Sequence, residues 1–192
     1  MGNQSASLPH ADPSVHKRIS DVIILVGFMG AGKTTVGAEL ARLLGWSFED
    51  LDDRIQSREG RTIEEIFRDA GETEFRRCEH LALRELLSEP ESDCRVIALG
   101  GGAFAQEKNV SLLQDMNVRS VFLDAPIEEL FRRCQQQGLH RPLRQDEAHF
   151  RRLYESRAPL YRAATFHVET NGKAVPQIAA EIARTLGISP SK

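Results

Sequence analysis

The sequence predicts an α/β fold in which helices cover both faces of a parallel sheet. Short apolar runs rich in β-branched residues alternate with longer segments that repeat apolar residues at helical spacing. The 192 residues suffice for one domain with a continuous core, while two domains would be cramped. We therefore expect one domain over residues 20–192. Residues 1–19, rich in Ser, Pro, His and Asn, are expected to form a flexible tail.

Five short apolar runs are expected to form the strands. The first, residues 22–26, is apolar throughout, which suits a strand that is covered on both faces of a parallel sheet. The second begins with Trp46 and Phe48 and is expected to end within residues 50–53. The remaining strands are expected at residues 95–99, 118–123 and 166–169.

Apolar periodicity and helix-terminating residues mark the helices between these strands. Gly45 ends the first helix, and Gly71 separates two later ones. Thr62 and Glu65 have the spacing of a capping box, and Pro126 has the favoured first position of a helix. The helices are expected at residues 36–44, from 55 onward, and at 63–69, 73–87, 107–116, 126–135, 147–164 and 175–186.

Residues 135–147 form a polar stretch that contains Gly138, His140, Arg141 and Pro142. Segments of this kind between two helices often close over a bound ligand, so we expect a mobile lid here. The alternative is a solvated connector, because polar loops are common on protein surfaces.

Composition indicates an ordinary soluble globular protein. Hydrophobic residues make up 41% of the chain and charged residues 28%, and the formal net charge is −3. A negative charge argues against a general affinity for nucleic acid, so we expect a small-molecule partner and no nucleic acid. No apolar run approaches the ~18 residues of a membrane span, and the N-terminus lacks the apolar centre of a signal peptide. We therefore expect no membrane partner and a cytoplasmic location.

The three cysteines, Cys78, Cys94 and Cys134, are widely spaced along the chain. Their odd number, without a C-x-x-C or Cys/His cluster, suggests neither a disulfide framework nor a zinc site. Thiols in a reducing cytoplasm are the simplest interpretation. The sequence leaves the assembly state open, and we take a monomer as the working expectation.

The segment that carries chemistry is residues 27–35, GFMGAGKTT, which fits the phosphate-binding pattern G-x-x-x-x-G-K-[ST]. In such a P-loop, glycines let successive backbone N–H groups surround a phosphate, and the following helix adds the positive end of its dipole. We expect Lys33 to reach the terminal phosphates and Thr34 to offer its hydroxyl to Mg²⁺. The alternative is a strand-to-helix turn without a ligand. The residues expected to bind the nucleotide are Gly30, Ala31, Gly32, Lys33, Thr34 and Thr35.

The carboxylate that P-loop proteins place near Mg²⁺ is missing from its usual position. The obvious strand, residues 95–99, runs into glycines and not into an aspartate. Asp50, at the expected carboxyl end of the second strand, is the nearest source of a carboxylate that acts on the metal through water, and Asp52 shares this position. The two could instead cap a helix. Residues 170–173 lack the aspartate of the guanine-binding N-K-x-D motif, which argues against a GTPase.

Six short blocks stand out along the chain: GFMGAGKT at 27–34, DLD at 50–52, ETEFR at 72–76, GGG at 100–102, RPL at 141–143 and RAPLY at 157–161. Their order and approximate spacing resemble those of shikimate kinases, and the resemblance covers about residues 21–186. It implies a three-layer P-loop NTPase fold, similar to nucleoside monophosphate kinases, with a five-stranded sheet in the order 2-3-1-4-5. It also implies ATP and Mg²⁺ as cofactors and shikimate as substrate.

The resemblance assigns roles on the acceptor side, in a substrate-binding region at about residues 52–80. Asp52 resembles the carboxylate that hydrogen-bonds the hydroxyl to be phosphorylated. Arg76 and Arg157 resemble a pair that grips the shikimate carboxylate, which suits two planar guanidinium groups. Either arginine alone could instead belong to a surface salt bridge. The other implied substrate-binding residues are the backbone of Gly100, Gly101 and Gly102, an apolar wall of Phe67 and Phe75, and Glu79, which positions the arginines.

On the nucleotide side, Asp50 resembles the residue that orients a Mg²⁺-bound water. Arg141 resembles the lid arginine that moves onto the phosphates and stabilises the charge of the transferred group. Arg133 resembles the residue that lies against the adenine, and Lys173 lies in a segment that resembles the adenine loop. The residues expected to be catalytic are Lys33, Asp52 and Arg141.

These residues together predict transfer of the γ-phosphate of ATP to the 3-hydroxyl of shikimate, a step of the chorismate pathway to aromatic amino acids. One alternative is another small-metabolite kinase of this fold, such as a gluconate kinase, which has no need of a paired arginine clamp. A second is a non-catalytic nucleotide-binding protein, which would be marked by loss of Lys33, Asp52 or a clamp arginine. The chain retains all of them.

Overall fold

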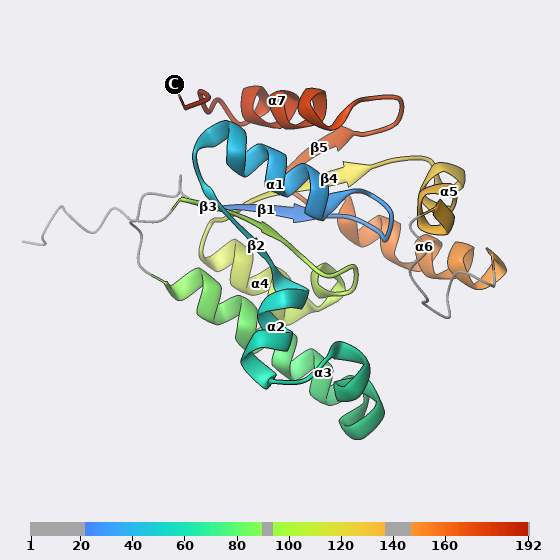
Figure 1. Cartoon of the computed structure of the whole chain (residues 1–192). Coiled ribbons are helices and arrows are strands. Elements are labelled where there is room, and N and C mark those ends of the chain that lie inside the picture. The colour runs from blue at the N-terminus through green and yellow to red at the C-terminus, as the bar shows by residue number, and fades with distance from the viewer. Residues whose placement is uncertain (1–21, 90–93, 137–146, 192) are drawn as a thin grey trace, which may run out of the picture.

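The computed structural model describes residues 22–89, 94–136 and 147–191, with one parallel sheet at its centre (Figure 1). The order of the five strands across the sheet is β2-β3-β1-β4-β5, which confirms the order that the resemblance implies. The strands are β1 (Val22–Val26), β2 (Ser47–Asp50), β3 (Arg95–Ala98), β4 (Arg119–Asp124) and β5 (Phe166–Glu169).

The first apolar run forms the middle strand of the sheet, as a doubly covered strand should. Ile23, Ile24 and Leu25 are each 0% exposed, and β1 pairs in parallel with β3 on one side and β4 on the other. β2 and β5 extend the sheet at its two edges, again in parallel. The carboxyl ends of all five strands therefore share one side of the sheet, where ligands of such folds bind.

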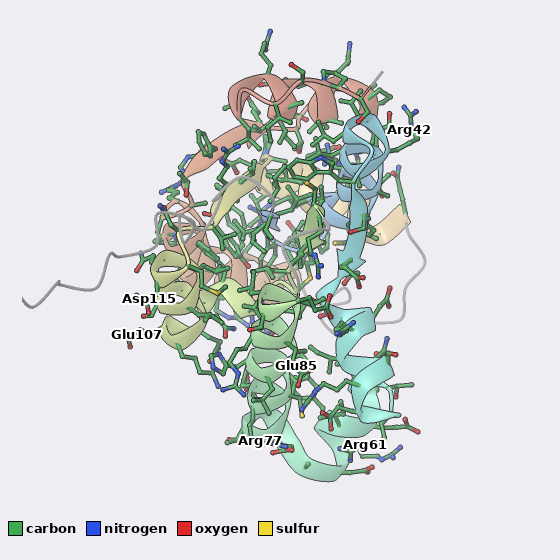
Figure 2. The ribbon with its side chains drawn as sticks, turned by 90° about the vertical axis from the view of Figure 1, so that its left-hand side faces the viewer. Arg42, Arg61, Arg77, Glu85, Glu107 and Asp115 are labelled. Atoms are coloured by element: carbon green, nitrogen blue, oxygen red, sulfur yellow. The ribbon has the colours of Figure 1, made fainter. Side chains whose placement is uncertain are left out.

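Helices cover the sheet on both faces (Figure 1). They are α1 (Lys33–Leu44), α2 (Leu51–Glu59), α3 (Ile63–Ser88), α4 (Glu107–Asp115), α5 (Ile127–Gln136), α6 (Glu147–Tyr161) and α7 (Val175–Thr185), with a turn of 3₁₀ helix, η1 (Ala103–Ala105), after β3. α1 packs on α7 above the sheet, whereas α4 and α6 lie below it. α2 packs on α3, and Arg61 and Arg77 lie near the end of this pair that is far from α7 (Figure 2).

Several details differ from the expectation, although the second strand ends at Asp50, within the expected residues 50–53. α1 begins at Lys33, three residues before its expected start. α2 begins at Leu51, four residues before its expected start, because the Asp50 carboxylate accepts a hydrogen bond from the Asp52 backbone N–H and caps this helix. The helices expected on either side of Gly71 form one element, α3, in which Gly71 is non-helical (φ 77°, ψ −179°). α6 ends at Tyr161, three residues before the expected end, and η1 was not expected. The strands and helices after residue 94, α6 apart, begin and end within one residue of their expected positions.

The expected tail, residues 1–19, and residues 137–146 of the expected lid lie outside the described residues. The three cysteines are free thiols, of which Cys78 and Cys134 are buried and Cys94 is half-buried. None of the helices in the described part of the chain is long and apolar enough to span a membrane.

Candidate active site

The glycine-rich loop between β1 and α1 adopts backbone conformations that suit glycine. Gly27, Gly30 and Gly32 have φ values of 149°, 80° and 88°, in a region that other residues rarely enter. Gly30 also lies against α5, because a Cβ atom on it would be 2.6 Å from the Leu130 carbonyl oxygen. The loop ends where α1 begins, so the unpaired N–H groups of the first turn of α1 face the loop. This arrangement suits a bound phosphate.

Lys33, the first residue of α1, turns its side chain back over the loop. Its Nζ donates to the carbonyl oxygens of Gly27 at 2.9 Å and of Phe28 at 3.1 Å. These bonds hold the ammonium group beside the first residues of the loop. A positive charge is thereby added to the dipole of α1 at the same anion site.

Thr34 and Asp50 bring two oxygen donors together at the start of α1. The Thr34 hydroxyl donates to Asp50 Oδ2 at 2.8 Å, while Asp50 Oδ1 accepts from the Asp52 backbone N–H at 3.0 Å. Asp50 therefore caps α2, as one of the two interpretations had it, and still faces the P-loop with its second oxygen.

Hard oxygen donors of this kind suit Mg²⁺, which proteins commonly hold through one or two side chains together with phosphate oxygens and waters. Across residues 22–89, 94–136 and 147–191 there is no group of three or more His, Cys, Asp or Glu side chains that could hold a metal ion. The hydroxyl of Thr34 and the carboxylate of Asp50 are two such oxygen donors, and they fit a Mg²⁺ ion that would arrive with a phosphorylated ligand.

The three glycines after β3 pack tightly against the expected acceptor residues. A Cβ atom on Gly100 would lie 2.6 Å from Asp52 Oδ1 and 3.5 Å from Glu79 Oε1. A Cβ atom on Gly102 would lie 2.6 Å from Arg76 Nη2. The structure thus brings Asp52, Glu79 and Arg76 to one loop, and a Cβ atom at either end of that loop would require Asp52 or Arg76 to move.

The middle glycine links this loop to α6. Arg157 Nη1 donates to the Gly101 carbonyl oxygen at 3.3 Å, and the Tyr161 hydroxyl donates to the same oxygen. A Cβ atom on Gly101 would lie 3.9 Å from the backbone nitrogen of Met29, which belongs to the P-loop. The acceptor residues and the phosphate loop therefore meet at Gly101.

On the acceptor side, a buried carboxylate, Glu79, is paired with the guanidinium of Arg76. The Glu79 side chain is 1% exposed, and Arg76 Nη1 donates to its two oxygens at 3.1 Å and 3.0 Å. Burial raises the pKa of Glu79 despite the opposing effect of the Arg76 charge and hydrogen bond. Glu72 accepts from the other edge of Arg76, at 3.3 Å from Nε and 3.2 Å from Nη2. The guanidinium plane of Arg76 is therefore oriented from two sides.

Phe67 and Phe75 lie on α3 on either side of the Gly71 kink. Their ring centroids are 4.5 Å apart, and Cζ of Arg76 is 5.0 Å from the centre of the Phe75 ring. Phe75 is buried, whereas Phe67 is 39% exposed. The two rings thus form an apolar surface beside Arg76, with Phe67 open to solvent.

Arg133 of α5 connects the P-loop with the segment that follows β5. Its Nη1 donates to the Gly30 carbonyl oxygen at 3.5 Å and to Thr170 Oγ1 at 3.3 Å, and its Nη2 donates to the Thr170 carbonyl oxygen at 3.3 Å. Glu129 accepts from Arg133 Nε at 2.7 Å. Lys173, in the same segment as Thr170, donates to Glu181 of α7 at 2.7 Å. Arg133 therefore lies at the P-loop, while the ammonium of Lys173 is held against α7.

A buried network supports the glycine loop from α4. Asn109 is 0% exposed and donates from Nδ2 to the Ala103 carbonyl oxygen at 3.0 Å. Its Oδ1 faces His80 Nδ1 at 2.8 Å, so His80 Nδ1 carries the proton. Lys108 donates to the Arg76 carbonyl oxygen at 3.2 Å. α4 thus joins the end of the glycine loop to the helix that carries Arg76 and Glu79.

Sequence reasoning missed several residues that contact the expected site. Tyr161 stands in the last of the six blocks, four residues after Arg157, which is one turn of helix and would place both on one face. Nothing local identified Asn109 or His80, because their pairing joins two separate helices. Arg141, the expected lid arginine, lies outside the described residues.

Comparison with known proteins is consistent with this geometry. The family model for shikimate kinase matches residues 29–187. A curated shikimate kinase from Thermus thermophilus is 42% identical over 173 residues, which cover 88% of this chain and 91% of that protein. A solved shikimate kinase from Acinetobacter baumannii, in complex with shikimate, is 40% identical with a TM-score of 0.79 and covers 91% of this chain and 97% of the other.

The gluconate-kinase alternative is matched only at the level of fold. A solved gluconokinase from Sinorhizobium meliloti is 18% identical to this chain with a TM-score of 0.57, and covers 88% of this chain and 93% of the other. Likeness at that identity carries no information about the substrate.

Proposed function

The chain belongs to the shikimate kinase family, and we propose that it transfers the γ-phosphate of ATP to the 3-hydroxyl of shikimate, giving shikimate 3-phosphate and ADP. The observation that carries the proposal is the glycine loop. Gly100 lies against Asp52, Gly102 against Arg76, and Gly101 accepts from Arg157 beside the P-loop. A hydroxyl-binding carboxylate and two guanidinium groups therefore stand next to a phosphate site.

On the acceptor side, we assign the shikimate carboxylate to Arg76 and Arg157. Two guanidinium forks suit one planar carboxylate, and a small polar acid has little apolar surface to bury. Phe67 and Phe75 provide the apolar wall for its ring. Glu79 holds Arg76 in place, with the contact distances given above. The remaining contacts in this proposal come from the backbone of Gly100, Gly101 and Gly102.

On the nucleotide side, the backbone of residues 30–35 holds the phosphates and Lys33 neutralises the terminal ones. Thr34 and Asp50 would hold Mg²⁺, Thr34 directly and Asp50 through water, and the ion supplies positive charge to the phosphates when bound. Arg133 would flank the adenine with Lys173 beside it. Arg141, from the part of the chain that the structure does not describe, would complete the charge around the transferred group.

Charge and position matter more than proton removal in this reaction. Phosphoryl transfer passes through a loose transition state in which little negative charge has to be created on the attacking oxygen. Asp52 accordingly orients the 3-hydroxyl and accepts its proton late. Lys33 and the N-terminus of α1 stabilise the charge on the phosphate oxygens during transfer. Much of the remaining rate acceleration comes from holding both reactants in the correct orientation beside Gly101.

A coupled assay of ADP release, with and without shikimate, tests the proposal. We expect ADP release with ATP and Mg²⁺ to depend on shikimate, and phosphorus NMR to identify shikimate 3-phosphate as the product. Gluconate and other alcohols serve as acceptor controls in the same assay. Absence of shikimate-dependent ADP release would sink the proposal, and faster turnover of gluconate would replace it with the gluconate-kinase alternative. A cytoplasmic location and a monomeric state stay predictions from the sequence.

A further inference from the structure

We propose that Tyr161 is a positioning residue for the acceptor substrate, and that its hydroxyl fixes the Gly101 carbonyl group and, through it, the Arg157 guanidinium. The inference rests on the proposed function, because it concerns the same acceptor site. It adds a residue that would not touch the substrate but would set the geometry of one that does.

The two side chains share one acceptor atom. Tyr161 is the last residue of α6 and lies four positions after Arg157, so both project from one face of the helix. Arg157 Nη1 donates to the Gly101 carbonyl oxygen at 3.3 Å, and the Tyr161 hydroxyl donates to the same oxygen. A carbonyl oxygen has two lone pairs and can accept both bonds. Arg157 has five N–H groups, of which one donates to Gly101, and its guanidinium also interacts with the Tyr161 hydroxyl itself.

Packing places the Tyr161 hydroxyl with little freedom. The residue is 0% exposed, and its ring stacks on Phe122 of β4, with centroids 5.5 Å apart and planes at 30°. A buried ring that rests on the central sheet cannot move without disturbing the core. The hydrogen bond from the Tyr161 hydroxyl therefore connects the glycine loop to the rigid core. Arg157 is a long side chain, and its hydrogen bond to the fixed Gly101 carbonyl group restricts the position of its guanidinium.

The Tyr161 hydroxyl also keeps its proton, and remains a hydrogen-bond donor, at physiological pH. Burial raises the pKa of Tyr161 to about 12, although the positive charge of Arg157 opposes this effect. The O–H bond to Gly101 is therefore kept across the physiological range. Gly101 is the point at which acceptor residues and P-loop meet, so its carbonyl orientation affects Arg157 and the distance between the two reactants together.

Tyr161→Phe is the direct test, because the ring and its contact with Phe122 remain. We expect the shikimate KM to rise about fivefold, as for the loss of one hydrogen bond between neutral groups, with the ATP KM changed less than about twofold. Tyr154→Phe is the matched control, since Tyr154 is the chain's other tyrosine and lies on the same helix. Its ring contact with Phe28 is kept, and we expect both KM values to stay unchanged.

A double-mutant cycle separates positioning from a general loss of structure. If Tyr161 acts through Arg157, Tyr161→Phe should change kcat/KM for shikimate far less in an Arg157→Ala background than in the parent protein. The initial slope of rate against shikimate gives kcat/KM even where saturation is not reached. Thermal unfolding of each variant checks that it is folded.

Two results would overturn the inference. One is a shikimate KM for Tyr161→Phe that equals that of the parent protein. The other is the same fold-change in both backgrounds, which would mark a structural role only. Failure of the proposed function is a different outcome, because the parent protein would then release no shikimate-dependent ADP at all.

Discussion

The two halves of the proposed active site use glycine for different physical reasons. In the P-loop, Gly27, Gly30 and Gly32 have positive φ values of 149°, 80° and 88°, so glycine is needed for the backbone conformation. In the glycine loop, residues 100–102, Gly102 has an ordinary φ of −108°. Glycine is favoured there because a Cβ atom would lie 2.6 Å from Arg76 Nη2. The first requirement is local, whereas the second exists only in the folded protein.

The same difference separates the side chains of the two halves. Most of the proposed phosphate site lies in nine consecutive residues, 27–35. The proposed acceptor site instead consists of residues that approach the glycine loop from α2, α3 and α6. A change in the donor half should therefore act mainly on turnover, and a change in the acceptor half mainly on the recognition of shikimate.

The largest expected effect is that of Lys33→Ala. The substitution removes the ammonium group that the carbonyl oxygens of Gly27 and Phe28 hold at the P-loop. We expect kcat to fall by about a thousandfold, as when a preorganised group that stabilises transition-state charge is lost. Steady-state kinetics measure kcat, and calorimetric titration measures shikimate binding, which should change little. A comparable loss of shikimate affinity would contradict the division into two halves.

Arg157→Ala should produce the complementary result on the acceptor side. We expect the shikimate KM to rise by about a hundredfold, because two charge-assisted hydrogen bonds to the carboxylate are lost, while the ATP KM changes little. An unaltered shikimate KM would rule out the assigned carboxylate clamp.

Arg76→Ala is a less selective test of the same clamp. It also removes the guanidinium that donates to both oxygens of the buried Glu79 carboxylate. A buried carboxylate that loses its positively charged partner destabilises the fold. Its thermal unfolding should therefore be measured beside its shikimate KM, so that loss of stability is not read as loss of recognition.

Gly102→Ala should have a smaller effect than either arginine substitution. The new Cβ atom would stand 2.6 Å from Arg76 Nη2, so the guanidinium has to move, and we expect the shikimate KM to rise about tenfold. Gly101→Ala is the matched comparison within the loop, because its nearest atom, Arg157 Nη1, is 3.8 Å away at ordinary contact distance. Kinetics that rank the two substitutions in the reverse order would show that space is not what glycine provides here.

The sequence predicted the strand, loop and helix around residues 27–35, and the sheet, because these depend on short-range chemistry. Each of three predicted features depends on only a few neighbouring residues, and all three are present in the structure. They are the loop of the P-loop pattern, the apolar strand β1, and the capping box of Thr62 and Glu65. Asp50 shows the limit of such reasoning. In the sequence, capping α2 and facing the P-loop are alternative roles for Asp50, yet its two oxygens do both.

The acceptor half could be proposed only through resemblance to a family. The pairing of Asn109 with His80 and Ala103 joins segments that no local pattern relates. The contact of Gly101 with Tyr161 spans 60 positions of the chain. Such contacts arise from the order of strands in the sheet. A single sequence does not reveal them, although the spacing of Arg157 and Tyr161 by one helical turn was a usable signal.

The smallest expected effects concern two glutamates that hold arginines in opposite surroundings. On the nucleotide side, hydrogen bonds from Arg132 and Arg133 lower the pKa of Glu129 from 4.5 to about 2. On the acceptor side, burial outweighs the Arg76 contacts and raises the pKa of Glu79 above 4.5. Between pH 2 and 4.5 the unfolded chain binds more protons at Glu129, so stability rises with pH. Above pH 4.5 the folded protein binds more protons at Glu79, so stability falls as pH rises through the raised value.

Glu129→Gln and Glu79→Gln should therefore shift the pH dependence of stability in opposite directions. The quantity to compare is the free energy of unfolding of the parent protein minus that of the variant, from urea titrations between about pH 3.5 and about pH 7.5. For Glu129→Gln this difference should increase with pH and level off above about pH 5.5. For Glu79→Gln it should decrease, since glutamine does not titrate and the parent protein alone bears the cost of a buried charge. Slopes of the same sign would mean that the Arg76 contacts outweigh burial at Glu79.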